Sequence, residues 1–168
     1  GSSAWYKNRC AVFKAFKYAK EQKQGKELKL VLVGPPAQVD EIDPCDRNWI
    51  ENNSNEIISI TNASEQVLQE LYLNAELLIF PSYIEGFGWP PLEAASVGCR
   101  VVTTKTGAIH DLLGQNAYYV DPSDQRSVNA VVSEVLNSKK TFKTRVSLPS
   151  YDQCRDEYYS LYDQIIKN

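Results

Sequence analysis

The sequence predicts an α/β domain built around a parallel sheet. Short apolar runs alternate with stretches whose apolar residues recur at helical spacing, which is typical of right-handed strand–helix–strand crossovers. With 168 residues, 43% of them hydrophobic, the chain is long enough for one domain with a real core. The expected strands are 28–33, 56–60, 76–80, 101–104 and 118–120.

Helices are expected between these strands and after the last of them. Asn62 and Glu65 have the spacing of a capping box, which marks the start of the third helix. The aromatic stripe of the last helix is expected to pack in the core or against another domain. The expected helices are 5–23, 46–53, 62–74, 90–97, 121–138 and 151–167. The expected buried face of the third helix consists of Val67, Leu68, Leu71 and Tyr72.

The most informative stretch runs from Pro81 to Arg100 and reads Pro-Ser-Tyr-Ile-Glu-Gly-Phe-Gly-Trp-Pro-Pro-Leu-Glu-Ala-Ala-Ser-Val-Gly-Cys-Arg. An apolar strand delivers the backbone to a glycine-punctuated loop, and Pro90 suits the first turn of the helix that follows. Gly98 is expected just after the end of that helix. Two carboxylates lie on this unit, with Glu85 in the loop and Glu93 in the first helical turn.

The chemistry of this stretch suits a ligand that carries hydroxyl and phosphate groups. Gly86 and Gly88 lack side chains, so backbone N–H groups can approach a ligand closely. The helix N-terminus beyond them favours a diphosphate, and two carboxylates could accept hydrogen bonds from sugar hydroxyls. The alternative is that the glycines only make a turn and that Glu93 caps its own helix. Local sequence favours neither interpretation over the other.

Composition excludes several other classes of protein. The formal net charge is −3 with no long run of Lys or Arg, so a nucleic-acid partner is not expected. No apolar stretch approaches transmembrane length, and no signal peptide is visible. Four scattered cysteines without a C-x-x-C pair, beside one histidine, predict no metal site and indicate reduced thiols in the cytosol. Cys99, just before a strand, is expected to fill the core.

The spacing of Glu85 and Glu93 within Pro-Ser-x-x-Glu-Gly-Phe-Gly-x-Pro-Pro-Leu-Glu-Ala resembles the E-x7-E signature of retaining family-4 glycosyltransferases. The resemblance extends over most of the chain. It implies a GT-B fold, in which two Rossmann-like, three-layer αβα domains face each other and the C-terminal one holds the nucleotide-sugar donor. Residues 1–168 would be that single C-terminal domain. Its first strand and the N-terminal acceptor domain would lie ahead of Gly1, outside this chain.

The resemblance also implies roles for individual residues. Glu85 would be the catalytic residue that hydrogen-bonds the donor sugar hydroxyls, and Glu93 would bind the nucleotide ribose. Lys7 would steady the diphosphate together with two backbone N–H groups, those of Phe87 and Gly88.

Four further residues belong to the implied donor-binding set. Gly86 lies on the glycine-punctuated loop, and Leu92 lies on the helix that follows it. Ile60 and Thr61 would contact the nucleobase, largely through backbone atoms. The alternative for the latter two is a plain capped helix with no ligand role.

The chain departs from the family pattern at several positions. Ser2 stands where arginine is usual, which weakens the diphosphate site unless Arg9 or another base supplies the charge; Gly1 and Ser2 also read as a cloning scar. Asp111 replaces a usual glutamate. His110 is expected to be a partly exposed helical histidine and not a catalytic one. The remaining departures are Arg100, often proline, and Ala108, often glycine.

The function implied is transfer of a sugar from a nucleoside diphosphate sugar to an acceptor glycan, lipid or other molecule, in polysaccharide or glycoconjugate biosynthesis. No cofactor or metal is implied. The expected partners are the nucleotide-sugar donor and the acceptor domain. The expected location is the cytoplasm, and attachment to the inner face of the membrane through the absent domain is a further possibility. The isolated chain is expected to bind donor weakly and to transfer nothing.

Three other interpretations stay open. A degenerate, non-catalytic nucleotide-sugar-binding domain is favoured by Ser2. A GT-B epimerase is disfavoured by the Pro-Pro-Leu-Glu context. A hydrolase using Glu85 and Glu93 would need carboxyl groups facing each other across a cleft, which one loop and the next helix do not readily provide.

Overall fold

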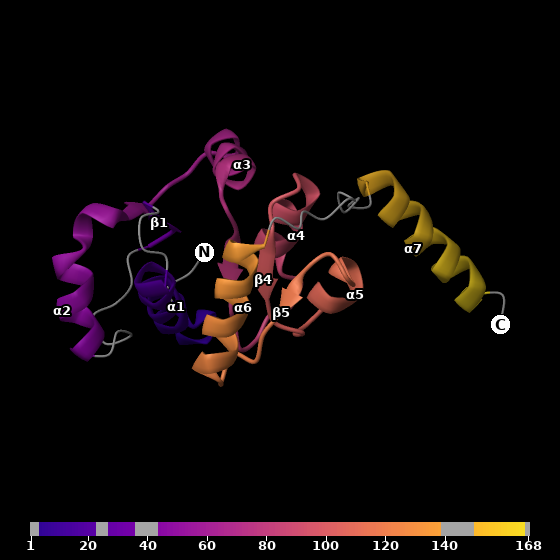
Figure 1. The fold of residues 1–168 in the computed structure, drawn as a ribbon. Coiled ribbons are helices and arrows are strands. Elements are labelled where there is room, and N and C mark those ends of the chain that lie inside the picture. The colour runs from indigo at the N-terminus through magenta and orange to yellow at the C-terminus, as the bar shows by residue number, and fades with distance from the viewer. Residues whose placement is uncertain (1–3, 23–26, 36–43, 139–149, 167–168) are drawn as a thin grey trace.

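The computed structural model describes residues 4–22, 27–35, 44–138 and 150–166. Within these ranges each of the five expected strands is present, though each is shorter than predicted (Figure 1). In chain order the elements are a 3-10 turn η1 (Trp5–Lys7), α1 (Arg9–Gln22), β1 (Leu30–Val33), α2 (Pro44–Asn52), a 3-10 turn η3 (Ser54–Glu56), β2 (Ile57–Ile60), α3 (Glu65–Asn74), β3 (Leu78–Phe80), α4 (Trp89–Ser96), β4 (Val101–Thr103), α5 (Ile109–Leu113), β5 (Tyr118–Tyr119), α6 (Gln125–Asn137) and α7 (Tyr151–Ile166).

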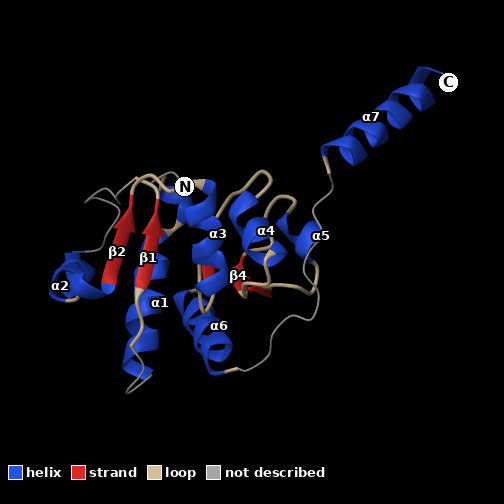
Figure 2. Cartoon of the chain, turned by 90° about the horizontal axis from the view of Figure 1, so that it is seen from above, coloured by secondary structure: helices blue, strands red, loops and turns tan. Residues whose placement is uncertain are grey.

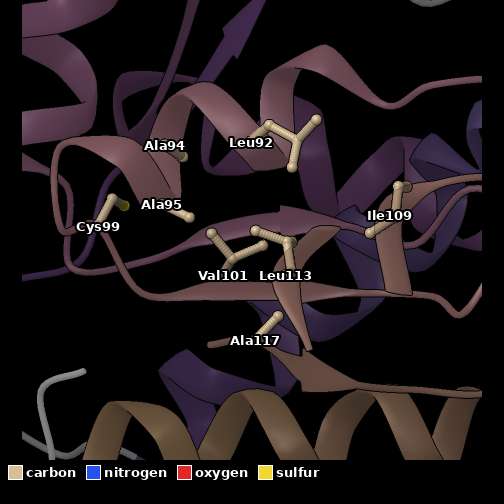
Figure 3. Packing of buried hydrophobic residues seen from close by; sticks show 8 residues of the cluster. All are labelled: Leu92, Ala94, Ala95, Cys99, Val101, Ile109, Leu113 and Ala117. Atoms are coloured by element: carbon tan, nitrogen blue, oxygen red, sulfur yellow. The ribbon is translucent and has the colours of Figure 1, made fainter. Parts of the chain in front are cut away.

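Successive side chains of a strand point to opposite faces of its sheet, so β4 can pack against helices on both faces. The domain has three layers at this strand. Val101 packs with Leu92 of α4 and Leu113 of α5 on one face (Figure 3). Val102 packs on the other face with Ala15 of α1 and Val132 of α6. All of these side chains are essentially inaccessible to solvent. The predicted αβα sandwich of a Rossmann-like domain is thereby confirmed.

The described strands form two parallel sheets and not one. One sheet has the order β1-β2, visible side by side in Figure 2, and the other has the order β3-β4-β5. Leu30 of β1 and Ile79 of β3 belong to the same apolar cluster around Phe13 and Phe16 of α1. Hence β1 and β3 pack on the same helix as edge strands, without a ladder between them.

The N-terminal helix begins later than predicted. Residues 5–7 form a 3-10 turn, and Asn8 follows in the left-handed region with φ of +52°. Asparagine tolerates this conformation better than most residues, and the buried Asn8 amide donates to the carbonyl of Pro122 over 3.0 Å. The interruption separates Lys7 from α1 and turns it toward the loop after β3.

The start of α3 also differs from the prediction. Ser64 is the N-cap, because its Oγ accepts a hydrogen bond from the backbone N–H of Val67 over 3.3 Å. Asn62 therefore does not cap the helix. The predicted burial of Val67 is wrong, since its side chain is 42% exposed, and the other three expected face residues are only partly buried. Among the described elements, this helix packs mainly against α4.

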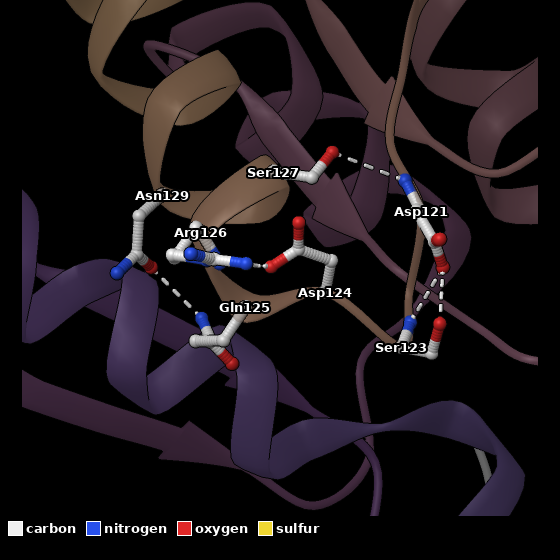
Figure 4. Close-up of polar contacts among 7 residues, drawn as sticks. All are labelled: Asp121, Ser123, Asp124, Gln125, Arg126, Ser127 and Asn129. Atoms are coloured by element: carbon white, nitrogen blue, oxygen red, sulfur yellow. Dashed lines mark hydrogen bonds and ion pairs between the residues drawn. The ribbon is translucent and has the colours of Figure 1, made fainter.

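The turn before α6 is held by short-range hydrogen bonds (Figure 4). Asp124 caps the helix by accepting from the backbone N–H of Arg126 over 3.0 Å. Asp121 accepts from both the backbone N–H and the hydroxyl of Ser123, and these bonds lower the pKa of the Asp121 carboxyl. The helix buries Val128, Val132 and Val135 on one face.

The last helix, α7, extends away from the rest of the chain (Figures 1 and 2). Its side chains are exposed apart from the half-buried Cys154. The expected packing of its aromatic stripe is therefore not seen among the described residues. Across those residues, no helix combines the length and the apolar character needed to cross a membrane.

Candidate active site

The candidate site lies where the η1 turn meets the loop between β3 and α4. The backbone N–H of Tyr83 donates to the carbonyl of Tyr6 over 2.8 Å, which ties the two segments together. Just beyond these two residues, the Lys7 Nζ lies 2.5 Å from Glu85 Oε1. The fold thus joins two predicted site residues that are 78 positions apart in sequence.

The Lys7–Glu85 ion pair is largely shielded from water. The side chains are 17% and 9% exposed, respectively. The ammonium also lies 5.3 Å from the ring centre of Tyr6 and 5.1 Å from that of Phe80, within the range of cation–π attraction. Lys7 is therefore held as a fixed positive charge at the end of β3 and is not a solvated surface lysine.

Three glycines shape the loop, for different reasons. A Cβ on Gly107 would lie 2.2 Å from the carbonyl oxygen of Gly86 and 2.3 Å from that of Glu85, so this glycine allows close backbone packing. Gly88 has a φ of +81°, and a Cβ there would overlap Ile109. A Cβ added to Gly86 would meet no atom within 4 Å. Of these three glycines, Gly86 is therefore the one with open space beside its Cα.

Glu93 makes no described contact with the ion pair, and it lies in a different turn of the helix from the one predicted. Because α4 begins at Trp89, Glu93 is its fifth residue and belongs to the second turn. The N-cap is Gly88, so Glu93 does not cap its own helix. Its Oε2 accepts a hydrogen bond from the hydroxyl of Tyr72 on α3 over 3.2 Å. Burial, together with the charge of Glu93, raises the pKa of Tyr72.

The remaining predicted residues of the loop and helix differ in exposure. The Leu92 side chain is fully buried in the core, so only its backbone is left for a ligand (Figure 3). Phe87 is 38% exposed, and its ring centre lies 4.4 Å from that of Trp89. The predicted use of its backbone N–H is compatible with a side chain directed to the surface.

Ile60 and Thr61 are not joined to these residues by any described contact. They lie at the end of β2, in the other sheet, where the carbonyl of Ile60 accepts from the N–H of Gly34 over 2.9 Å. Arg9, the candidate replacement for the missing arginine, donates to the carbonyl of Pro35 over 2.5 Å. Ser2 lies outside the described residues.

Sequence reasoning missed the aromatic residues around the loop. Trp5 is 70% exposed and lies 6.1 Å from the ring of Tyr83, and Trp89 is 56% exposed. Exposed aromatic side chains gathered at one place are uncommon on a soluble domain and accompany binding surfaces. The density of aromatic residues in the loop sequence was the available signal.

Neither Cys99 nor His110 has the surroundings expected of a catalytic residue. Cys99 is buried, and burial raises the pKa of its thiol to about 11, so it fills the core as expected and is no nucleophile at neutral pH. His110 is half-exposed on α5, as expected, with its ring 5.2 Å from that of Tyr119. In the described part of the chain no group of three His, Cys, Asp or Glu side chains gathers as metal ligands would.

Layers of helices on parallel strands, with a charged loop following a strand, define an α/β domain of the class that binds ligands at the carboxyl ends of its strands. Residues 1–152 match the family of glycosyl transferases group 1, and the chain belongs to that family. The family resemblance in the sequence is confirmed at this level, and so is the GT-B type of fold.

Two of the curated relatives are bacterial glycosyltransferases. The chain is 27% identical over 123 residues to the capsular polysaccharide biosynthesis glycosyltransferase CapM of Staphylococcus aureus, covering 72% of this chain and 32% of the relative. It is 35% identical over 68 residues to the O-antigen chain mannosyltransferase RfbU of Salmonella typhimurium, covering 40% of this chain and 19% of the relative. The chain thus spans a third or less of these proteins.

Solved structures share the fold. The C-terminal domain of the glycosyl transferase group 1 family protein LpcC from Francisella tularensis superposes with a TM-score of 0.61 at 21% identity, over 90% of this chain and 80% of that domain. The UDP-forming α,α-trehalose-phosphate synthase from Burkholderia xenovorans superposes with a TM-score of 0.63 at 17% identity, over 80% of this chain and 34% of that one.

Proposed function

We propose that residues 1–168 are the C-terminal, nucleotide-sugar-binding domain of a retaining family-4 glycosyltransferase. The full enzyme would move a hexose from a nucleoside diphosphate sugar to an acceptor glycan, lipid or other molecule. The observation that carries the proposal is the shielded pair of Lys7 and Glu85 beside a loop with an open glycine, in a chain of this family.

The pair has the chemistry that donor binding requires. Lys7 would bind the diphosphate oxygens, and the backbone N–H groups of Phe87 and Gly88 would add donors. Glu85 would accept hydrogen bonds from the donor sugar hydroxyls. Negative charge grows on the diphosphate as it leaves, and donors already fixed in place stabilise that charge without reorganising. The side chains would therefore act through electrostatics, with no metal or cofactor needed.

The ligand-free pair also prepares the site. Lys7 and Glu85 neutralise each other where water is scarce, so neither charge is left unpaired before the donor arrives. The diphosphate would give Lys7 a second anionic partner without first ordering a flexible lysine. Less conformational entropy is then lost on binding.

The other members of the proposed donor site lie along the strand ends. Glu93 would bind the nucleotide ribose, and Gly86 and the Leu92 backbone would line the loop. Ile60 and Thr61 would reach the nucleobase from the end of β2.

The relatives support sugar transfer in polysaccharide or glycoconjugate biosynthesis, since their names specify capsular polysaccharide and O-antigen synthesis. The likeness to a solved C-terminal domain supports the proposed domain assignment. We place the acceptor domain ahead of this chain and the enzyme in the cytoplasm, at the inner face of the membrane if the acceptor domain binds lipid. Fractionation of cells that express the full protein tests the location.

A strand ahead of Gly1 would complete the domain. The two edge strands β1 and β3 both pack on α1, and one strand between them would join the sheets. A chain extended by its upstream residues should then show slower amide hydrogen exchange in β1 and β3. Unchanged exchange would rule the strand out.

Titration of UDP, GDP and ADP sugars into the chain tests the proposal. We expect weak binding of at least one donor and a loss of affinity of about tenfold or more in Glu85→Ala and Lys7→Ala, because each removes one charged hydrogen-bonding group. Glu134→Ala and Lys29→Ala are matched controls at exposed positions and should bind as wild type does. Equal affinity in all five chains would overturn the assignment of the site.

An assay of sugar transfer by the full protein, run beside the titration, decides whether the domain is degenerate. In the full protein, donor binding without sugar transfer to any acceptor would favour a non-catalytic domain. The isolated chain should transfer no sugar, so detectable transfer by it would contradict the proposed missing acceptor domain.

A further inference from the structure

Tyr72 reaches Glu93 across the interface between α3 and α4. Its hydroxyl lies 3.2 Å from Glu93 Oε2, and its ring packs against the apolar cluster that includes Leu92 and Cys99. The ring therefore belongs to the packing between the two helices. The hydroxyl is attached to that packing but is directed at the one carboxylate of α4.

The direction of this hydrogen bond is fixed. Burial and the neighbouring Glu93 charge raise the pKa of Tyr72, so the phenol keeps its proton at neutral pH. Tyr72 is then the donor and Glu93 the acceptor. At 3.2 Å the bond is longer than the usual O–H···O distance, and hydrogen bonds of this kind in ligand-free sites commonly shorten when the ligand binds.

The contact engages one of the two carboxylate oxygens. An ionised carboxylate accepts at both oxygens, so the bond to Oε2 leaves Oε1 available for a ligand hydroxyl. Glutamate has three rotatable bonds, and a partner that holds one oxygen reduces the orientations of the other. Holding such a group in place before the ligand arrives lowers the entropy lost on binding.

We propose that Tyr72 is a positioning residue for ribose recognition: its hydroxyl orients the Glu93 carboxylate toward the vicinal hydroxyls of a nucleoside diphosphate. The inference rests on the proposed donor-binding function, because it assumes that Glu93 faces the nucleotide. It adds a residue on a different helix to the determinants of affinity. It also makes a specific claim about which ligand group is affected.

Tyr72→Phe removes the hydroxyl and keeps the ring, so it separates positioning from packing. The probes are UDP, GDP and ADP, each compared with its 2′,3′-dideoxy analogue by isothermal titration calorimetry on the 168-residue chain. For the best-bound nucleotide we expect Tyr72→Phe to weaken binding about five- to tenfold, which corresponds to the net contribution of one typical hydrogen bond. Affinity for the dideoxy analogue, which lacks the ribose hydroxyls, should stay within about twofold.

A matched variant and a double variant complete the test. Tyr119→Phe removes a hydroxyl that donates to the Gly114 carbonyl over 2.8 Å, away from Glu93, and should leave both affinities unchanged. In a Glu93→Ala background, which removes the acceptor of the Tyr72 hydroxyl, Tyr72→Phe should have no further selective effect on the ribose nucleotide.

Each outcome decides the point. Equal weakening of the ribose and dideoxy ligands would mean that Tyr72 only supports the fold. No weakening of either would mean that its hydroxyl does not contribute to binding. Both results would overturn the inference and leave the proposed donor binding intact. A wild-type chain that binds none of the nucleotides would overturn the proposed function, and this inference with it.

Discussion

Gly86, within the loop between β3 and α4, and Gly107, which packs against this loop, show how single residues decide the shape of the loop. A Cβ on Gly107, whose φ is +56°, would overlap the carbonyl oxygens of Glu85 and Gly86, whereas a Cβ on Gly86 would meet open space. The same residue type therefore serves packing at one position and access at the other.

Alanine at these positions should separate the two roles. Gly107→Ala should lower the free energy of unfolding by about 2–4 kcal/mol, because the methyl group overlaps two carbonyl oxygens and the backbone is strained. Gly86→Ala should change stability by less than about 0.5 kcal/mol, yet weaken donor binding. Urea denaturation measures the stability of the two variants, and donor titration measures the binding. Similar stability losses in the two variants would refute the assignment of packing to Gly107 and access to Gly86.

Residue types indicated part of the site but not its contacts. Lys7, Glu85 and Glu93 were named from the sequence, and the structure brings only the first two together. Nothing in a sequence specifies a contact across 78 positions, since it depends on how the strands are ordered. The Tyr72–Glu93 bond was missed for the same reason, because Tyr72 read only as an apolar member of its helix.

Elements were predictable where periodicity is strong and less so at their ends. The left-handed Asn8 shortened α1, and Ser64 rather than Asn62 capped α3, because side chains near a helix end compete for the same N–H groups. The exposure of Val67 follows from the limited contact of α3 with its neighbours, which its own sequence does not encode.

Arg100, just before β4, joins the end of α6 to the segment that leads into β3. Its guanidinium donates to the Glu76 carbonyl over 2.9 Å and to the Ser138 carbonyl over 2.9 Å, and it pairs with the Glu76 carboxylate over 2.8 Å. It also donates to the carbonyl of Val135 in the last turn of α6, where the helix dipole favours a positive charge. This position, often proline in the family, therefore anchors α6 beside the sheet.

Replacing this arginine should loosen α6. Arg100→Ala should cost about 2–3 kcal/mol of stability, and Arg100→Lys should recover little, because an ammonium cannot reproduce the fork of donors. Arg126→Ala, at a side chain that is 95% exposed, is the control and should be near neutral. Chemical denaturation of the three variants measures the effect; full recovery by lysine would contradict the proposed geometry.

At the scale of the whole molecule, the response to alkaline pH follows from burial. The pKa of the Cys99 thiol is about 11 in the folded chain against an ordinary value of 9.0, and burial likewise raises the pKa of Tyr72 and Tyr119. Above about pH 9 the unfolded chain therefore loses protons that the folded chain retains. Folding stability must then fall as the pH rises from about 9 to 11.

Cys99→Ala tests this pH dependence. Removing the thiol should make the loss of stability between about pH 9 and 11 shallower, whereas Cys154→Ala, at a half-buried thiol on α7, should leave it as in wild type. Thermal denaturation across this pH range gives the slopes. If the stability of the wild-type chain stayed constant or rose between about pH 9 and 11, the buried thiol would not govern the pH dependence of its stability.

The fold as a whole was the most predictable level, because alternating strands and helices admit few arrangements. The division into two sheets was not predictable from the residues present. Apolar strands such as β1 and β3 read alike whether they pair with each other or with a strand between them, so their sequences did not reveal that both are edge strands.

An exchange of the two charges between Lys7 and Glu85 tests the central claim most directly. We expect each single variant, Lys7→Glu or Glu85→Lys, to be destabilised, because like charges would then meet in a shielded site. The double variant should recover most of the stability but still fail to bind a nucleotide sugar, since position 7 would present a carboxylate to the diphosphate. Wild-type donor affinity in the double variant would contradict the account: the pair would then be a structural ion pair and not a donor site.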